Sequence, residues 1–353
     1  MRYILYSNEY FFEKRAIFMK LLDVKNLCID LNVGKNRVPV VRDVSFSVNK
    51  GEIMALVGES GCGKSLTNLS LARLLDEKVA SIRANSIEVM RRGEPFEIIS
   101  ANKREMRSIR GGTISYIFQE PAVSLNPVLK IQTQIAEVLR LHRKDVKNEK
   151  EEIIRLLNAV GIVDPAARLN AYPHELSGGM QQRIMIAMAL AAEPELLIAD
   201  EPTTALDVTI QAQILELIKR LCKERDMGVI LVTHNLGIVA QMADYVAIMY
   251  AGMIVEKGRT VDIITNPRHP YTKKLLSTVP ILGQKLDRLP TIPGTVPAVG
   301  EYPLGCRFYG RCGLCNSLSE EAQNCCKEII PDEFNLDDGR FIRCHAIKKE
   351  LGK

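Results

Sequence analysis

The order of hydrophobic and polar positions predicts strands that alternate with helices. "EIMALVG" (52–58) is a short, continuous apolar run that ends in glycine, as is typical of a buried strand, and "SLTNLSLARLL" (65–75) follows with a helical period. Further along the chain, the same patterns predict strands at 114–119, 196–200 and 229–234, and helices at 179–192, 208–225 and 236–243. Because the two kinds of element alternate, we expect an α/β fold whose mostly parallel sheet has helices on both faces.

The remaining segments outline the organisation of the chain. Residues 131–170 are helical and rich in charge, residues 245–258 are typical of a hairpin around Gly252, and prolines mark a linker near 280–305. We therefore expect an N-terminal extension (1–18), a main α/β domain (19–265) with a helical part at about 125–180, and a C-terminal region (266–353).

Composition excludes several classes of protein. With 46% hydrophobic and 25% charged residues, the 353-residue chain has ordinary globular values, and a net charge of +5 neither requires nor excludes nucleic acid. No apolar run approaches the roughly 18 residues of a membrane span, so any membrane role is peripheral or through a partner. The first 18 residues are interrupted by Asn8, Glu9 and Glu13, and no small-residue cleavage site follows, so we expect a cytoplasmic protein.

"GESGCGKS" (58–65) matches the G-x-x-x-x-G-K-[ST] phosphate-binding loop, or P-loop, and lies between the predicted strand and helix that this loop requires. Its glycines allow backbone N–H groups to turn toward phosphate oxygens, and the helix N-terminus adds a favourable dipole. We expect Lys64 to reach the β- and γ-phosphates and Ser65 to bind Mg²⁺. The predicted nucleotide-binding residues of the loop are Gly58, Glu59, Ser60, Gly61, Cys62, Gly63, Lys64 and Ser65.

Polar residues end the neighbouring strands. Asp200 follows four apolar residues in "LLIADEP", and carboxyl ends of parallel strands are where ligands bind in such sheets. Asp200 is suited to Mg²⁺, and Glu201 to orienting the attacking water as general base. The alternative is an acidic helix start, since Pro202 could begin a helix. His234, at the end of "VILVTH", could bond the γ-phosphate, and Gln119 could contact Mg²⁺ or water without adding charge.

Taken in order, GESGCGKS, Gln119, LSGGMQQR (176–183), LLIADE (196–201), TALD (204–207) and His234 resemble an ATP-binding-cassette (ABC) ATPase over about 20–300. "IFQEPAVSLNPVLKI", "YAGMIVEKG", "NPRHPYTKKLL" and the cysteine-containing tail resemble the dipeptide/oligopeptide/nickel importer subfamily. One departure is the absence of an aromatic residue between Leu27 and Val41, where the family usually stacks one on adenine. Leu31, Val33 or Val40 could provide only apolar contact.

The resemblance implies a P-loop fold, ATP and Mg²⁺, and a head-to-tail dimer. Ser177, Gly178 and Gly179 of one subunit would cap the γ-phosphate held by the other, and Asp207 would belong to the same nucleotide site. It also implies that "EPAVSLNPVLKIQTQIAEVL" (120–139) receives helices of a membrane subunit. The partners would be a similar or identical second ATPase, two transmembrane permease subunits and, indirectly, an extracytoplasmic binding protein. The protein would lie at the cytoplasmic face of the membrane.

The resemblance leaves the cargo open among di- and oligopeptides, nickel or another metal chelate, and oligosaccharides. Two other classes remain as alternatives: a soluble ABC ATPase and a nucleic-acid-binding protein built on the cysteine tail. The sequence has no sustained heptads between 66 and 176, which repair-type soluble ABC ATPases need. Its charges balance over 306–353, so the cysteine tail lacks the basic face that nucleic-acid binding needs.

Six of the nine cysteines fall between Cys306 and Cys344, with the spacing C-x5-C-x2-C-x9-C-C-x17-C. Without a secretion signal, metal ligation is favoured over disulfides. A zinc ribbon fits poorly because only Cys312 and Cys315 form a C-x2-C pair, whereas unequal spacings suit an iron–sulfur cluster. The resemblance implies a [4Fe–4S] cluster on Cys306, Cys312, Cys326 and Cys344, with Cys325 as the alternative third ligand. Zinc and free cysteines remain alternatives.

Overall fold

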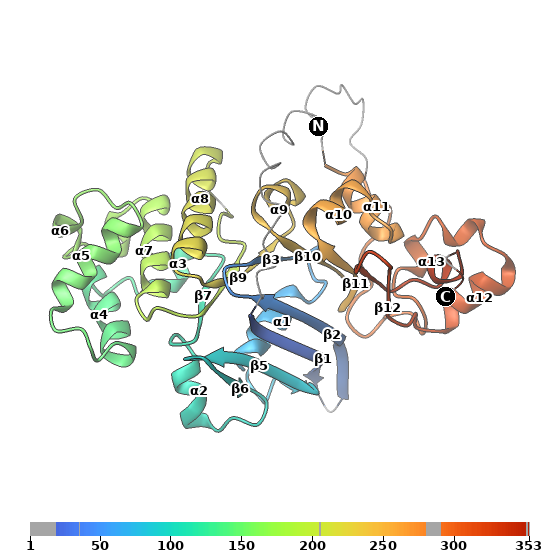
Figure 1. The fold of residues 1–353 in the computed structure, drawn as a ribbon, viewed down its shortest axis with the longest axis horizontal. Helices are drawn as coiled ribbons and strands as arrows, with labels where there is room; N and C mark the ends of the chain where they lie inside the picture. Colours follow the sequence, from blue (N-terminus) through green and yellow to red (C-terminus); the bar gives the residue numbers. More distant parts are fainter. Residues whose placement is uncertain (1–18, 35, 205, 280–290, 351, 353) are drawn as a thin grey trace.

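The computed structural model describes residues 19–34, 36–204, 206–279, 291–350 and 352. The predicted extension 1–18 and the part of the predicted linker at 280–290 lie outside the described residues. Figure 1 shows two sheets stacked at the centre, a group of helices on one side and the C-terminal region on the other. Among the described residues, no helix is long and apolar enough to cross a bilayer.

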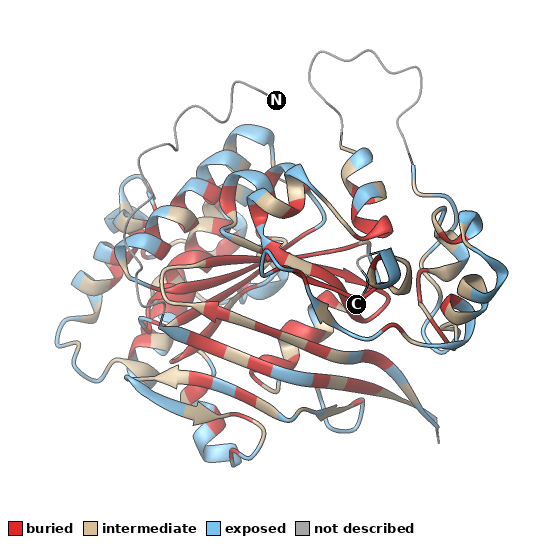
Figure 2. Ribbon diagram, turned by 45° about the vertical axis from the view of Figure 1, so that its right-hand side comes forward, coloured by how far each residue is buried: buried red, intermediate tan, exposed pale blue. Residues whose placement is uncertain are grey.

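The larger sheet is built around fully buried strands. Its order is β12-β13-β11-β10-β3-β9-β8-β7, and the pairs from β10 to β7 are parallel. The strand bounds are Phe334–Asn335, Phe341–Ile342, Met253–Arg259, Tyr245–Tyr250, Ile53–Val57, Gly228–Thr233, Leu196–Asp200 and Ile114–Ile117, in the order given. Figure 2 shows the strands from β11 to β7 buried along nearly their whole length, because helices cover them on one face and the second sheet on the other, whereas β12 at the edge is not buried. The predicted α/β fold with a mostly parallel sheet is confirmed, but the predicted helices on both faces are not, because one face packs mainly against the second sheet.

The second sheet is antiparallel, with the order β2-β1-β5-β6 and β4 paired to β1. Its strands are β1 (Lys20–Val33), β2 (Asn36–Asn49), β4 (Ala80–Arg83), β5 (Ser86–Arg91) and β6 (Glu94–Glu97). Buried and exposed residues alternate along β1 and β2 in Figure 2, as expected when one face packs on the core and the other meets water. The sequence patterns predicted no separate sheet and no elements for 80–97.

Helices occur where the patterns predict them, with shifted ends. α1 (Lys64–Leu71) ends earlier than the predicted residue 75 because Arg73 adopts a positive φ of 50°. α2 (Lys103–Ile109), which was not predicted, begins with a capping box of Asn102 and Glu105. The other helices before the C-terminal region are α3 (Pro121–Ser124), α4 (Ile131–His142), α5 (Glu149–Ala159), α6 (Pro165–Arg168), α7 (Gly178–Leu190), α8 (Val208–Glu224) and α9 (Leu236–Met242), with a 3₁₀ turn at Pro173–Glu175.

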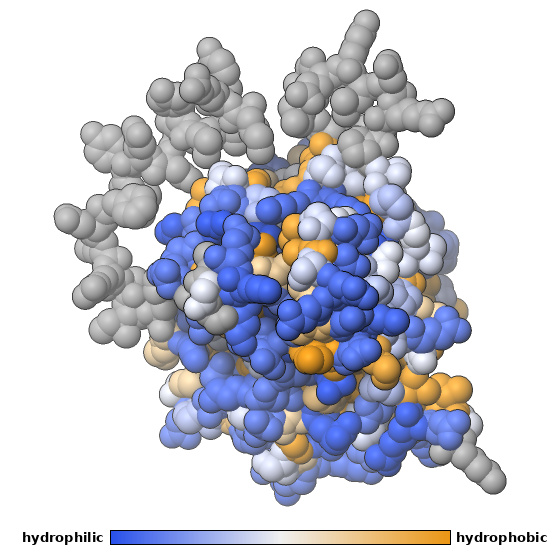
Figure 3. All heavy atoms as spheres, turned by 90° about the vertical axis from the view of Figure 1, so that its right-hand side faces the viewer, coloured by the Kyte–Doolittle hydropathy of each residue, from blue (hydrophilic) through white to orange (hydrophobic). Residues whose placement is uncertain are grey.

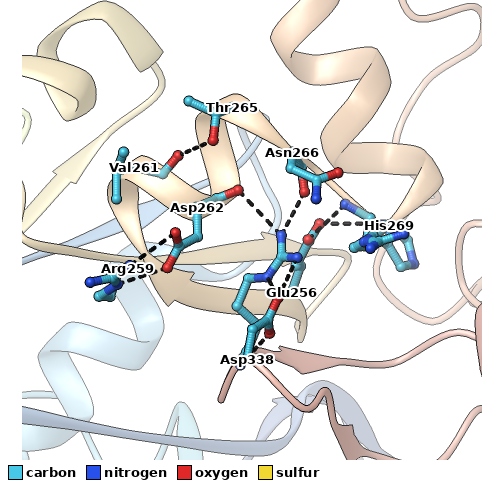
Figure 4. A network of polar contacts seen from close by, with 10 residues as sticks. Glu256, Arg259, Val261, Asp262, Thr265, Asn266, His269 and Asp338 are labelled. Carbon is cyan, nitrogen blue, oxygen red and sulfur yellow. Dashed lines mark hydrogen bonds and ion pairs between the residues drawn. The ribbon is translucent and has the colours of Figure 1, made fainter. Parts of the chain in front are cut away.

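The C-terminal region is bound tightly to the main domain. The main domain ends with α10 (Thr260–Thr265), and the helices of the C-terminal region are α11 (Pro270–Ser277), α12 (Glu320–Glu328) and α13 (His345–Glu350), with 3₁₀ turns at Tyr309–Arg311 and Cys315–Ser317. β13 pairs with β11, and Arg340 donates to Asp338 and to the Asp262 carbonyl. In the same network, buried Glu256 accepts from the backbone N–H groups of Arg268 and His269 (Figure 4). The face that carries this region is mainly hydrophilic where it is visible (Figure 3).

Candidate nucleotide site

The P-loop lies between β3 and α1, as its motif requires. Gly63 adopts a φ of 101°, which residues with a side chain rarely reach, and it forms the N-cap of α1. The Lys64 ammonium donates to the Gly58 carbonyl at 2.8 Å and to the Glu59 carbonyl at 3.1 Å. The ammonium therefore lies inside the loop, where it can exchange these carbonyls for phosphate oxygens.

Asp200 ends β8 beside the start of α1. Its carboxylate accepts a hydrogen bond from the Ser65 hydroxyl. Burial raises the pKa of Asp200; the Ser65 hydrogen bond opposes this rise, and the neighbouring Glu201 charge adds to it. A hydroxyl and a partly desolvated carboxylate in contact are ligands of the kind that Mg²⁺ prefers.

Three side chains from different parts of the chain converge on Glu201. His234 Nδ1 lies 2.9 Å from Oε1, Thr204 Oγ1 donates to Oε2 at 3.0 Å, and Gln119 Nε2 donates to Oε2 at 3.4 Å. Burial raises the pKa of Glu201, but the hydrogen bonds from His234 and Thr204 outweigh this and lower it. Glu201 is therefore ionised at neutral pH and able to accept a proton.

The backbone of Glu201 is strained. Its φ is 46°, in the left-handed region, and its N–H donates to the Val232 carbonyl on β9 at 3.0 Å. Such a conformation costs roughly 1–3 kcal/mol in a residue other than glycine and persists where the surroundings enforce it, often at functional sites. Here it turns the Glu201 side chain toward Gln119 and His234.

The residues predicted to cap the γ-phosphate of a partner subunit lie away from the P-loop. Ser177 caps α7 by accepting from the Met180 N–H at 3.4 Å, and Gly179 packs against Ile210 near the start of α8. Asp207 caps α8 through the Ile210 N–H at 3.0 Å. Figure 1 shows α7 among the helices on one side of the molecule, apart from α1 at its centre. Within one chain, the structure does not bring Ser177, Gly178, Gly179 or Asp207 to the P-loop.

The segment expected to face adenine is largely closed. Val40 and Val41 are buried at 1% exposure, and Val41 packs against Gly63. Val33, in contrast, is 58% exposed, and Leu31 is half-buried. Of the apolar residues considered for base contact, Leu31 and Val33 are the accessible ones.

A small cavity in the C-terminal region is lined by five cysteines: Cys306, Cys312, Cys315, Cys326 and Cys344. Cys325 instead lines an outer groove beside Leu314 and Leu318. Burial raises the pKa of the Cys306 thiol to about 12 and also raises that of Cys312, Cys326 and Cys344. Within the described ranges, no three His, Cys, Asp or Glu side chains converge closely enough to hold a single metal ion.

Some contacts at these sites were not predicted. Thr204 donates to Glu201, although no separate role was predicted for it within the TALD motif. Cys315 lines the cavity, although it is not among the predicted cluster ligands. The Glu59 side chain forms an ion pair with Arg311, and the Glu59 N–H donates to the Tyr271 hydroxyl. The only feature of the sequence that could have indicated the contact with Glu59 is the position of Arg311 next to Cys312.

Comparison with known proteins identifies the family of the chain. The chain matches a family described as "ABC transporter" over residues 41–204 and one described as "Oligopeptide/dipeptide transporter, C-terminal region" over residues 255–317. The dipeptide transport ATP-binding protein DppD of Bacillus subtilis is 46% identical over 326 residues, which cover 92% of this chain and 94% of that protein. The oligopeptide transport ATP-binding protein AppD of the same organism is 44% identical over 331 residues, which cover 94% and 98%.

Solved structures show the same fold. An ATP-binding subunit of an ABC transporter has a TM-score of 0.55 at 28% identity, with 69% of this chain and 92% of that chain covered. A dimeric cassette in a post-hydrolysis state with ADP and Pi has a TM-score of 0.59 at 24% identity, with 68% and 99% covered. Because close sequence relatives match it almost from end to end, the chain belongs to the ATP-binding proteins of ABC transporters, in the group with an oligopeptide/dipeptide transporter C-terminal region.

Proposed function

We propose that this chain is the ATP-hydrolysing subunit of an ABC importer for di- or oligopeptides. The observation that carries the activity is the convergence of Gln119, Thr204 and His234 on Glu201, beside the Ser65–Asp200 pair. The cargo rests on the relatives, whose names include dipeptide and oligopeptide transport.

The proposed chemistry uses residues that already lie together. Lys64 and the P-loop N–H groups bind the β- and γ-phosphates, and bound Mg²⁺, held by Ser65, Asp200 and Gln119, would neutralise phosphate charge. Glu201 accepts the proton of the attacking water because its carboxylate is ionised at neutral pH. His234 and Gln119 hold that carboxylate and the water in line with the γ-phosphate.

A head-to-tail dimer accounts for the separation between the P-loop and the second phosphate-binding segment, residues 177–179. Ser177 begins a helix whose N-terminal N–H groups favour an anion, yet it lies away from the P-loop of its own chain. In the proposed dimer, Ser177, Gly178, Gly179 and Asp207 complete the site of the partner. ATP then joins two subunits, and loss of the γ-phosphate opens the interface.

The segment after β7 is proposed to dock on two membrane permease subunits at the cytoplasmic face, with a substrate-binding protein on the other side. Phe118, Val123 and Val128 are 43%, 79% and 75% exposed, an unusual concentration of apolar side chains for a surface segment. Gln119 immediately precedes the predicted docking residues 120–139 and contacts Glu201, so nucleotide state and docking are linked.

The cysteine-lined cavity fits an iron–sulfur cluster better than zinc. Zinc needs its ligands within about 2.3 Å of a single atom, whereas a cluster binds each thiolate to a different iron and spreads them around a cage. Thiols surround the cavity, and Cys326 rather than Cys325 is among them. We propose Cys306, Cys312, Cys326 and Cys344 as ligands of a [4Fe–4S] cluster, with Cys315 as a fifth thiol at the same cavity.

Uptake measurements test the function. A deletion strain carrying this chain should recover uptake of labelled di- and tripeptides, and one carrying Glu201→Gln should not. Labelled nickel and oligosaccharide serve as alternative cargoes. Recovery of one of these in place of peptides would reassign the cargo, and uptake that is independent of the gene for every solute would contradict the proposal.

Metal analysis tests the cluster. Protein purified without oxygen should contain about four irons and matching sulfide per chain and absorb visible light. Cys326→Ser should lose most of the iron, while Cys325→Ser, the matched control, should keep it. One zinc per chain would support zinc instead, and absence of both metals from protein kept anaerobic throughout would contradict both.

A further inference from the structure

Arginines adjoin three of the cavity cysteines, and each reaches into the ATPase domain. Arg307, next to Cys306, donates to the carbonyls of Val40 and Ala251. Arg311, next to Cys312, forms an ion pair with Glu59 of the P-loop. Arg343, next to Cys344, forms an ion pair with Asp43 on β2 at 3.0 Å. All three side chains are buried, so the wall of the cavity is joined to the ATPase domain at three places.

Arg311 makes the contact nearest to the nucleotide. Its two terminal nitrogens lie 2.7 and 3.0 Å from the two carboxylate oxygens of Glu59, a two-pronged pair that fixes direction as well as distance. Its other N–H groups donate to the carbonyls of Pro293 and Ile292, at 2.9 and 3.3 Å. The Arg311 side chain is 7% exposed, so solvent screens the pair weakly.

The backbone of Glu59 is held from the same side. The Tyr271 hydroxyl accepts from the Glu59 N–H at 3.1 Å. Tyr271 packs against Phe308, with ring centroids 5.4 Å apart, and Phe308 lines the cysteine cavity. Residues of the C-terminal region therefore hold both the side chain and the backbone N–H of Glu59.

We propose that Arg311 is a positioning residue for ATP binding. Through Glu59 it keeps the P-loop in the shape that receives phosphate, and it thereby makes ATP affinity depend on the order of the cysteine-lined cavity. This inference rests on the proposed ATPase function. The physical reason is that a loop which adopts the binding conformation only part of the time has its apparent ATP affinity reduced by that fraction.

Equilibrium binding of ATP to the full chain, kept anaerobic, tests the positioning role. Arg311→Ala should raise the Kd for ATP about tenfold, as expected if the competent loop falls to about a tenth of the population. kcat at saturating ATP should change much less, because Arg311 touches no reacting group. Arg311→Lys keeps the charge without the two-pronged geometry, so its Kd for ATP should lie between those of the parent and Arg311→Ala. This second variant keeps the test valid if the alanine variant misfolds.

The matched control is Arg259→Ala. Arg259 makes a similar two-pronged pair with Asp262, at 2.8 and 3.1 Å, but at α10 rather than at the P-loop. Its removal should leave the Kd unchanged. Glu59→Gln should weaken binding as Arg311→Ala does, and the double variant should be no weaker than either single one. An unchanged Kd in Arg311→Ala, or additive effects in the double variant, would overturn the positioning role.

Cysteine variants test the link to the cavity. Cys312→Ser should weaken ATP binding in the parent chain but have no further effect in Arg311→Ala, and Cys325→Ser, outside the cavity, should have none. An equal effect of Cys312→Ser in both backgrounds would show that Arg311 is not the link. Failure of the parent to bind ATP would overturn the proposed function and this inference together, whereas normal binding by the parent confines any failure to the inference.

Discussion

At the scale of single residues, the proposed general base, Glu201, is strained, partly buried and held ionised by its neighbours. Asp200 is adjacent in sequence, but its pKa is shifted in the opposite direction because its surroundings desolvate it more than they compensate its charge. Two adjacent carboxylates with pKa values pushed apart suit two different roles, one toward metal and one toward water.

We predict that Glu201→Gln binds MgATP but hydrolyses it at least about 10²-fold more slowly, because the amide has no basic oxygen for the proton of water. Steady-state phosphate release and nucleotide binding measure the two parts. Glu216→Gln, on the exposed side of α8, is the control and should hydrolyse ATP at the parent rate. Hydrolysis by Glu201→Gln at the parent rate would remove Glu201 from the role of base.

At the scale of elements, the β10–β11 hairpin connects the sheet to the P-loop. Gly252 at its turn has a φ of 84°; its N–H donates to the Cys62 carbonyl at 2.8 Å, and its own carbonyl accepts from the Arg42 N–H at 2.9 Å. A Cβ at Gly252 would overlap the Val40 carbonyl. The predicted hairpin around Gly252 therefore forms, and the backbone of three segments meets at its turn.

We predict that Gly252→Ala destabilises the fold by about 3 kcal/mol or more, since it combines a left-handed conformation with a backbone clash. Gly93→Ala is the matched control. Gly93 lies at the β5–β6 turn with a φ of 86°, but a Cβ there meets nothing within 4 Å, so we expect only the conformational cost of about 1–2 kcal/mol. Denaturant unfolding measures both, and equal losses would show that the close approach to Val40 is unimportant.

At the scale of the whole molecule, the two cradles lie apart and face different surroundings. The P-loop is surrounded by the sheet and the C-terminal region, whereas α7, whose N-cap is Ser177, lies among the helices on the other side of the molecule (Figure 1). ATP bound by one chain alone therefore leaves its second cradle unused, which is the reason for proposing a dimer.

We predict that Ser177→Arg abolishes hydrolysis while nucleotide binding to the monomer stays nearly intact, because a large cation at the partner's γ-phosphate prevents closure. Asn148→Arg is the matched control, since Asn148 also caps a helix of the same group, through the Glu151 N–H at 3.3 Å. Hydrolysis and dimerisation in the presence of MgATP are the measurements. Loss of ATP binding in the Ser177 variant itself would contradict action in trans.

Local patterns in the sequence were sufficient for the parallel sheet, most of its helices and the P-loop. Short apolar runs identify buried strands, and the P-loop chemistry needs neighbouring residues only, so both can be recognised without distant contacts. The β7, β8 and β9 strands are parallel neighbours, and this allowed Gln119, Glu201 and His234 to be expected at one edge. The structure places Gln119 and His234 in contact with Glu201.

What only the tertiary structure decided depends on contacts between distant segments. The second sheet forms because β1 pairs with β4 and β5, although β2, β3 and α1 lie between them in the chain. The sequence alone could not show that Cys326 rather than Cys325 reaches the cavity, because that depends on how α12 is rotated. The pairing of Arg311 with Glu59 joins residues 252 positions apart. No local pattern encodes such a pair, since its geometry exists only once the C-terminal region has packed against the P-loop.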